Sequence, residues 1–367
     1  MRKIPLNYVD EGMLLGRSII DSEGNILLRA GVELDEYYLR RLYEIGIHYI
    51  YILDAIFGEE EEADVISEET RITTVKLVKK TFSYLQQDRK INTIALRKIV
   101  NNLLDEILDN SNVLLSISDI STLDNRIFYH SVSVCTLSIM TGITMNYNDT
   151  KLKELGIGAL LHDIGKSKID PDLLNRSGDL NEEESALLAK HPELGYSIIR
   201  DYGDLSLLSA HVALQHHERW DGKGYPRQLA GHNIHEYARI VAAANTYDEL
   251  MTDRPKRPAY QVNQAINLIK RMTNIYFDPA VIAAMISNIA SYPLGSFLKL
   301  NTGEIGIVSR INAETPQRPT LRIIIDKSQR RVQHPHEIDL SRMTTIIPVE
   351  VLSERDLQKL MPRKSGA

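Results

Sequence analysis

The spacing of hydrophobic residues divides this chain into three kinds of pattern. Over residues 1–56, short apolar segments alternate with turn-rich stretches, which predicts a small mixed α/β domain. Within it, residues 34–42 have helical spacing and residues 48–53 alternate as a strand does. His48 lies alone in that apolar strand, so packing is a simpler interpretation than metal ligation.

From residue 65 to about 290, apolar residues recur at every third or fourth position, as in helices that bury one face. Asp149 is the expected N-cap of one helix, and Asn181 with Glu184 forms a capping box for another. The sequence His191-Pro192 opens a further helix. The other predicted helices cover residues 65–85, 93–108, 126–145, 149–162, 205–217, 236–251, 260–272 and 279–289.

After Tyr292-Pro293, apolar residues occur at every second position, and residues 297–300, 305–311 and 321–325 are predicted strands. The predicted fold class is therefore mainly α, a helical bundle with a small N-terminal α/β domain and a small C-terminal β module. The expected parts are an accessory domain (1–58), an acidic linker with connecting helices (59–110), the helical domain (111–291), the β module (292–352) and a tail (353–367). The linker is marked by the acidic run at residues 59–62, although a solvated helix start would show the same exposure.

Composition narrows the class of protein. The 367 residues carry a formal net charge of −6, which argues against a dedicated binder of nucleic-acid polymers or anionic membranes, although a local basic pocket stays open. No apolar run is long enough to span a bilayer or to act as a signal peptide, so a cytoplasmic protein is expected. The single cysteine, Cys135, lies in an apolar run and is interpreted as a core residue rather than a nucleophile.

The stretch from His216 to Pro226 carries the strongest candidate chemistry. Its adjacent imidazoles, His216 and His217, can both bind metal through neutral ring nitrogens. Glu218 and Asp221 are close enough in sequence to orient those rings, and the glycines and proline that follow favour a tight loop. The alternative is a solvated helix end that runs into a turn.

More candidate ligands lie at the ends of predicted helices. His162-Asp163 closes one helix, His191 opens another, and His130 lies on the helix over residues 126–145. A helical bundle can gather such side chains from separate helices into its core. Mixed imidazole and carboxylate donors suit Fe, Mn, Zn or Co, and Asp163 can bridge two ions. Each histidine alone is more typical of a hydrogen-bonded core residue, but together they predict a pair of metal ions.

These residues resemble the HD-GYP subgroup of the HD phosphohydrolases. The resemblance rests on residues 162–166 (HDIGK), on His191-Pro192 and on the stretch from His216 to Pro226, and it covers about residues 110–290. It implies metal-dependent hydrolysis of cyclic di-GMP, to linear pGpG or on to GMP. The N-terminal domain and the C-terminal strands look like accessory modules found beside such domains.

The resemblance also implies roles for individual residues. One metal would be held by His130, His162 and Asp163, and the second by Asp163, His191, His216 and His217. Lys166 would bind a substrate phosphate or stabilise developing charge, so Lys166 and Asp163 are the expected catalytic residues. Tyr225, Arg254 and Arg257 would contact the nucleotide, and a solvated turn is the alternative for the two arginines.

Two positions depart from the family pattern. Where the family places a ligand aspartate in Ala-Asp-x-Tyr-Asp, this chain has Asn245, whose amide oxygen can bind metal only weakly because it carries no charge. Asp248 matches a different family position and is not expected to be a ligand. Where some members hold a third metal through a glutamate, this chain has Arg126, which cannot ligate. A binuclear site is therefore the most that we expect.

The preferred interpretation is a cytoplasmic cyclic di-GMP phosphodiesterase with two divalent ions, Fe or Mn first and Zn, Co or Ni as alternatives. One rival is a catalytically weak or inactive cyclic di-GMP sensor, because Asn245 replaces a charged ligand. The other is an HD phosphohydrolase that acts on a different nucleotide, which the loop at Gly224-Tyr225-Pro226 disfavours. Besides cyclic di-GMP, a homodimer or a signalling-protein partner is expected, with neither a nucleic-acid polymer nor membrane insertion.

Overall fold

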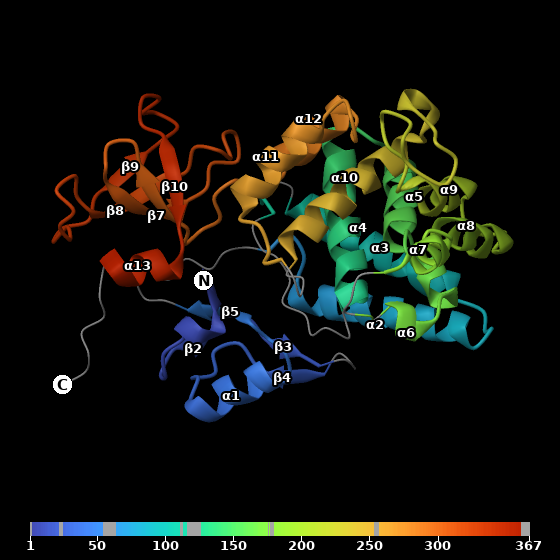
Figure 1. The fold of residues 1–367 in the computed structure, drawn as a ribbon, viewed down its shortest axis with the longest axis horizontal. Helices are drawn as coiled ribbons and strands as arrows, with labels where there is room; N and C mark the ends of the chain where they lie inside the picture. Colours follow the sequence, from blue (N-terminus) through green and yellow to red (C-terminus); the bar gives the residue numbers. More distant parts are fainter. Residues whose placement is uncertain are drawn as a thin grey trace. The chain divides into compact units, whose positions relative to one another are not determined.

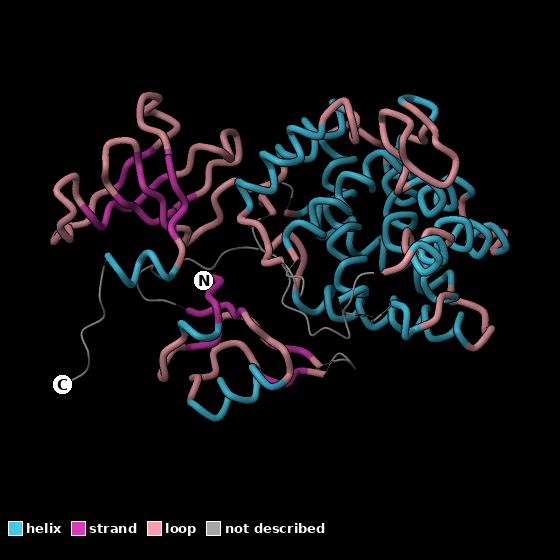
Figure 2. Tube along the Cα trace, viewed as in Figure 1, coloured by secondary structure: helices cyan, strands magenta, loops and turns pink. Residues whose placement is uncertain are grey.

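The computed structural model describes residues 2–21, 25–53, 64–110, 113–115, 126–174, 176, 180–252 and 257–360. The chain divides into a helical unit that ends at Ile289 and a second unit that holds the N-terminal domain and the C-terminal module (Figures 1 and 2). Each part has its own hydrophobic cluster. The mainly α fold class expected from the sequence is confirmed.

The helical unit contains every helix that apolar spacing predicts. Several of its N-caps are polar side chains that accept a hydrogen bond from the first turn, such as Ser67 and Asn92. One cap differs from expectation, because Asn148 caps its helix and Asp149 lies one residue inside, where its charge suits the helix dipole. The elements are α2 (Glu68–Gln86), α3 (Thr93–Asp109), α4 (Arg126–Thr144), α5 (Asp149–Leu160), η4 (Ile164–Lys168), α6 (Pro171–Leu174), α7 (Glu182–Leu188), α8 (His191–Asp201), α9 (Leu207–Gln215), η5 (Gly231–Asn233), α10 (Glu236–Met251), α11 (Val262–Met272) and α12 (Pro279–Ser287).

Helix α4 lies at the centre of this unit and contacts α2, α3, α5, α10 and α12. Within the described residues it is the one helix long and apolar enough to cross a membrane, but 67% of that window is buried inside the unit, as in a core helix. Cys135 on α4 is fully buried and its thiol donates to the Gly156 carbonyl at 3.3 Å. Burial raises the pKa of this thiol to about 12, so the prediction of a core cysteine is confirmed.

Helices α2 and α3 share the core of the later helices. Val78 on α2 and Leu103 on α3 are fully buried in the same cluster as α4 and α5. The end of α2 is also tied to η4, because the Lys168 ammonium donates to the Leu85 carbonyl and to the Asp88 carboxylate, each at 2.6 Å. The segment expected to connect two domains is thus part of the helical unit.

The N-terminal domain is a small α/β fold. A three-stranded antiparallel sheet of order β1-β5-β2 and a β3-β4 hairpin enclose buried residues such as Ile4, Leu15 and Ile50. The acidic run at residues 59–62 lies outside the described residues. The elements are β1 (Arg2–Pro5), η1 (Leu6–Tyr8), β2 (Leu14–Leu15), β3 (Ile19–Ile20), β4 (Ile26–Leu28), α1 (Glu36–Glu44) and β5 (Tyr49–Leu53).

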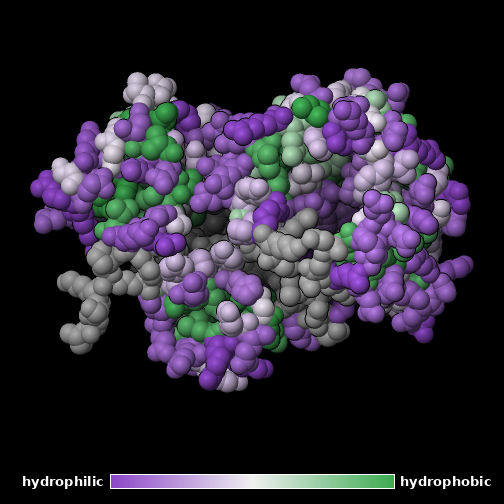
Figure 3. Space-filling view, in the orientation of Figure 1, coloured by the Kyte–Doolittle hydropathy of each residue, from purple (hydrophilic) through white to green (hydrophobic). Residues whose placement is uncertain are grey.

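The C-terminal module is an antiparallel sheet of order β10-β6-β7-β8-β9. Its strands are β6 (Phe297–Leu300), β7 (Ile305–Arg310), β8 (Thr320–Ile325), β9 (Glu337–Asp339) and β10 (Pro348–Leu352). A short helix, α13 (Glu354–Leu360), occupies part of the predicted tail and buries Leu357 against Phe297 and Ile325. On the face drawn in Figure 3, hydrophobic residues gather on this module and on the N-terminal domain, within a mainly hydrophilic surface.

Candidate metal centre

Five histidines and one aspartate from four places in the helical unit converge on one point. His130 lies in the first turns of α4, His162 and Asp163 follow α5, and His191 begins α8. His216 and His217 follow the last turn of α9. His162, Asp163, His191 and His216 are each at most 3% exposed, so the cluster is a buried site rather than a surface patch.

The two carboxylate oxygens of Asp163 face two different groups of imidazoles. On one side, Oδ2 lies 3.4 Å from Nε2 of His162 and 3.9 Å from Nε2 of His130. On the other side, Oδ1 lies 3.3 Å from Nε2 of His191 and 3.7 Å from Nε2 of His216. We call these groups position A (His130, His162 and Asp163) and position B (Asp163, His191, His216 and His217).

Most of these rings are held from behind by backbone carbonyls. Nδ1 lies 2.8 Å from the Ala159 carbonyl in His162, 2.7 Å from the Leu188 carbonyl in His191 and 2.9 Å from the Ala213 carbonyl in His216. A carbonyl can only accept a hydrogen bond, so Nδ1 carries the hydrogen in each ring. A neutral ring then directs the lone pair of Nε2 toward Asp163.

His130 is held by a carboxylate instead. Its Nδ1 lies 2.6 Å from Oδ2 of Asp248 on α10. Burial alone would lower the pKa of His130, but the hydrogen bond and charge of Asp248 outweigh it and the pKa is raised. Sequence reasoning did not assign this contact. The available signal was spacing, since Asp248 follows Asn245 by three residues and shares its helix face.

The cluster has the donor chemistry of a metal centre. Nε2 of His162 and Oδ1 of Asp163 are buried without a hydrogen-bond partner, and Nε2 of His191 lies 3.2 Å from Nε2 of both His216 and His217. Such lone pairs repel each other unless a cation lies between them. Imidazole and carboxylate groups are donors that divalent transition metals bind. Burial lowers the pKa of His162 and takes that of His191 to about 3, so both stay neutral.

The carboxylate is ionised as well. Burial raises the pKa of Asp163, but Lys166 and His162 outweigh that effect and hold it well below its usual range. The residues present therefore fit divalent cations at both positions, with Asp163 as the shared anion.

Two close backbone approaches require glycine. A Cβ on Gly165 would lie 2.0 Å from the His191 carbonyl oxygen, so only glycine lets η4 pack this tightly on the start of α8. A Cβ on Gly224 would lie 2.5 Å from the His217 carbonyl oxygen. Gly165 therefore allows the close approach of two elements that carry ligands, and Gly224 allows the loop after His217 to fold back closely on itself.

Glu218 and Asp221 contact the loop after His217, and their predicted role in orienting the imidazoles stays a prediction. The Glu218 carboxylate is 3% exposed and accepts hydrogen bonds from the amides of Arg227 and Leu229, at 2.7 and 3.0 Å. The Asp221 carboxylate binds the Arg219 guanidinium at 2.6 Å. Both acids lie next to the ligands in sequence, but their side chains point into the loop.

Comparison with known proteins bears on the fold and the motif. Residues 105–281 match the HD domain family, and residues 297–360 match a KOW domain associated with the HD domain. This match, together with relatives named as cyclic di-GMP phosphodiesterases, confirms the predicted resemblance of the helical unit to the HD-GYP group.

Its curated relatives are named as cyclic dinucleotide phosphodiesterases. The cyclic di-GMP phosphodiesterase PA4108 of Pseudomonas aeruginosa is 32% identical over 71% of this chain and 63% of its own length. The 3′3′-cGAMP-specific phosphodiesterase 2 of Vibrio cholerae is 32% identical over 35% of this chain and 25% of its own length. The chain thus spans less than two thirds of these relatives. A solved structure, Bd1817, an HDG"Y"P protein of Bdellovibrio bacteriovorus, shares the fold with a TM-score of 0.51, at 20% identity over 77% of this chain and 97% of that one.

The other predicted site residues of the helical unit lie around the cluster of candidate ligands, each with different contacts. Lys166 donates to Oδ2 of Asp163 at 2.5 Å and its side chain is 26% exposed, so it borders position A from the solvent side. Tyr225 stacks on the His217 ring, with centroids 4.7 Å apart and planes 15° apart. Asn245 is 6% exposed on α10, one turn before Asp248.

The two arginines differ. Arg254 lies outside the described residues. Arg257 donates from its guanidinium to the Glu249 carbonyl at 2.8 Å and lies over the Tyr260 ring, 5.0 Å from its centroid. These contacts anchor Arg257 to the end of α10, and its predicted contact with a nucleotide stays a prediction.

Proposed function

We propose that this chain is a metal-dependent phosphodiesterase that hydrolyses cyclic di-GMP to linear pGpG, to GMP, or to both. The observation that carries the proposal is the division of Asp163 between two imidazole groups, each able to hold one divalent ion. Two such ions would supply an activated water and neutralise the oxygens of a phosphodiester. The two ions are expected to be Fe or Mn, with Zn, Co or Ni as alternatives, because the donors are imidazoles and a carboxylate.

The protein's own residues would bind and orient the substrate. Lys166 stands at the partly exposed rim of the cluster and can reach a phosphate oxygen with its ammonium group. Tyr225 is 37% exposed beside His217 and offers a ring against which a base can stack. Arg254 would add a bidentate contact to phosphate or guanine. The imidazoles of His162, His191 and His216, whose Nδ1 atoms are engaged by backbone carbonyls, would hold their positions without moving a proton.

A second candidate function is a cyclic di-GMP sensor with little or no turnover. The observation that favours it is Asn245, a buried neutral amide on the helix face that also supplies Asp248 to position A. With Asp163 as the one carboxylate in the predicted donor set, the site holds more positive charge than one with a second acid. Phosphate binding would survive this change better than hydrolysis.

The test is incubation of anaerobically loaded protein with cyclic di-GMP, followed by chromatography of the products and by equilibrium binding. Formation of pGpG or GMP with Fe or Mn supports the phosphodiesterase. Tight binding without product supports the sensor. A parallel reaction with 3′3′-cGAMP separates the two dinucleotides, and the absence of both binding and product for each would contradict both proposals.

A further inference from the structure

The way each ligand ring is held depends on where it lies in its helix. The last carbonyls of a helix have no partner inside the helix. His162 and His216 bind such carbonyls at the ends of α5 and α9, and His191 binds the carbonyl of Leu188, the last residue of α7. Each of these rings is therefore oriented by the end of the helix that precedes it in the chain.

His130 cannot use this solution. It lies in the second turn of α4, where the preceding carbonyls belong to the helix itself, and the Ile127 carbonyl also accepts the Ser131 hydroxyl. Its Nδ1 needs an acceptor from another helix, which is Asp248 at 2.6 Å. The side chains of His130 and Asp248 are 13% and 21% exposed, so water screens this contact only in part.

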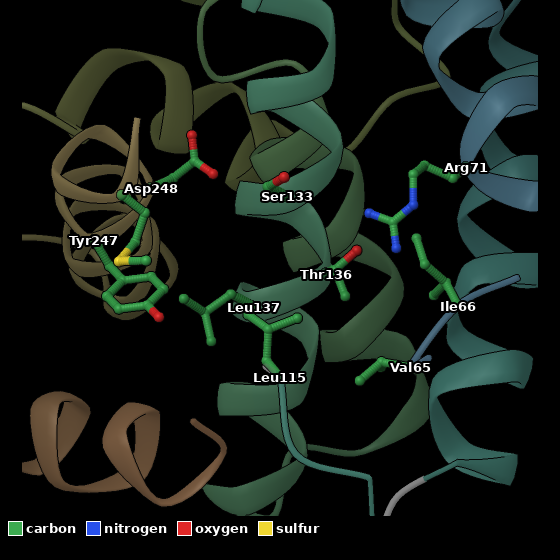
Figure 4. Close-up of a pocket in the computed structure, with 10 residues that line it drawn as sticks. Val65, Ile66, Arg71, Leu115, Ser133, Thr136, Leu137, Tyr247 and Asp248 are labelled. Atoms are coloured by element: carbon green, nitrogen blue, oxygen red, sulfur yellow. The ribbon is translucent and has the colours of Figure 1, made fainter. Parts of the chain in front are cut away.

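Asp248 also lies against a small cavity between α2, α4 and α10. In Figure 4, Asp248 and Tyr247 face Ser133, Thr136 and Leu137 of α4. The cavity has a volume of about 30 Å³, room for about one or two water molecules. The Asp248 carboxylate thus lies between the cluster of candidate ligands and this small cavity, rather than fully in solvent.

We propose that Asp248 is the positioning residue of position A: its charge, one hydrogen bond behind His130, sets how tightly the ion at that position binds. The inference rests on the proposed function, in that position A holds a divalent ion. A carboxylate that accepts the hydrogen of a ligand imidazole fixes the ring and makes its other nitrogen a stronger donor. Asp248 thus contributes from behind His130 a negative charge that Asn245 does not contribute.

This arrangement makes position A depend on the packing of α10 against α4. Position B receives its ring orientation from helix ends and from the stack of His217 on Tyr225. Position A needs α10 to remain in register with α4, because the Asp248 carboxylate that binds Nδ1 of His130 comes from that helix. A change confined to α10 should therefore alter one metal position and leave the other intact.

The experiment measures metal per chain and the affinity of each Co²⁺ or Mn²⁺ equivalent by calorimetry, with the visible absorption of bound Co²⁺ as a second readout. Asp248→Asn keeps an oxygen acceptor but removes the charge, and it should weaken one equivalent by about ten- to a hundredfold while the other keeps its affinity. His130→Ala should remove the same equivalent. Glu236→Gln is the matched control, because Glu236 is an ion-paired carboxylate on α10 bound to Lys151 and Tyr147.

The outcomes separate the two claims. If His130→Ala loses one equivalent while Asp248→Asn and Asp248→Ala both keep it with unchanged affinity and Co²⁺ absorption, the positioning role of Asp248 is wrong. If His130→Ala also keeps both equivalents, the assignment of position A is wrong. The two-metal site on which the proposed function rests would then be wrong as well. Equal melting temperatures for Asp248→Asn and Glu236→Gln would show that lost metal does not reflect unfolding.

Discussion

The two metal positions share one carboxylate but are built differently. Position B collects three imidazoles from α8 and from the end of α9; carbonyls a few residues earlier in the chain orient the rings of His191 and His216, and the ring of His217 stacks on Tyr225. Position A has two imidazoles, depends on a contact between α4 and α10, and shares Oδ2 of Asp163 with the Lys166 ammonium. The difference shows that groups nearby in the chain are enough to orient the rings of position B, whereas orienting His130 at position A needs the packing of α10 against α4.

The largest expected effect is loss of a whole ion. His216→Ala removes one of three imidazoles from position B, so most of one metal equivalent should be lost while the other remains. Elemental analysis of protein loaded without oxygen measures this. His211→Ala is the matched control, since His211 lies on the same helix outside the cluster. Unchanged metal content in the His216 variant, and likewise in His217→Ala, would contradict the assignment of B.

Lys166→Met should separate substrate binding from metal binding. The loss of a charge-assisted contact to phosphate should weaken cyclic di-GMP binding by about 1.5–3 kcal/mol. The same change frees Oδ2 of Asp163, so the ion at position A should bind more tightly, while B is unaffected. Calorimetry with the metal and with the nucleotide gives both values. Weaker metal binding at A would mean that Lys166 supports the cluster rather than competes for it.

The two arginines beyond α10 should also behave differently. Arg254→Ala should weaken cyclic di-GMP binding by about 1.5–3 kcal/mol with little change in melting temperature. Arg257→Ala should lower the melting temperature, because it removes the contact to the Glu249 carbonyl. Equilibrium binding and thermal unfolding of both variants check this pair. A reversed result, with Arg257 governing affinity and Arg254 governing stability, would overturn the distinction.

The variant Asn245→Asp tests whether metal occupancy of position A is limited by the lack of a second negatively charged side chain. An added carboxylate on this face of α10 should raise the occupancy of A toward one ion per chain and increase the hydrolysis rate, with B unchanged. Metal analysis and product chromatography of both proteins, loaded in the same way, give the answer. If neither occupancy nor rate rises, the amide is not the cause of weak activity.

The smallest expected effect is the pH dependence of the metal-free protein. The pKa of His191 is lowered by burial to about 3, below its value of about 6.5 when unfolded, so its contribution to stability is present above pH 6.5 and is lost as the pH falls. The pKa of His130 is raised, so its contribution is present below pH 6.5 and is lost as the pH rises through the folded value.

Relative to the unmodified chain, His191→Ala should therefore be less sensitive to acid, and His130→Ala should be more destabilised at pH 5 than at pH 8. Urea midpoints of the metal-free proteins at these two pH values measure both effects. Parallel shifts in the two variants would show that the positions do not differ in protonation.

Sequence alone predicted most of the helices and four of the ten described strands (β5, β6, β7 and β8), because apolar spacing and capping residues act over a few positions. The ligand set came from motif resemblance, and the structure gathers its five histidines around Asp163. The contact of Glu218 with the Arg227 amide was not predictable from spacing, and for the contact of Asp248 with His130 the spacing of Asp248 from Asn245 was a signal that named no partner. Which oxygen of Asp163 serves which ring also depends on side-chain orientation, which spacing does not encode.

The contact between Gly165 and His191 has a mechanical consequence. With no room for even one extra carbon between η4 and the start of α8, Asp163 and His191 move together as one piece. At position A, an adjustment to an ion of different radius would then come from the opposite side of the site, which α4 and α10 form. Crystals grown with a series of divalent ions would show this as displacement of His130 while His191 stays in place.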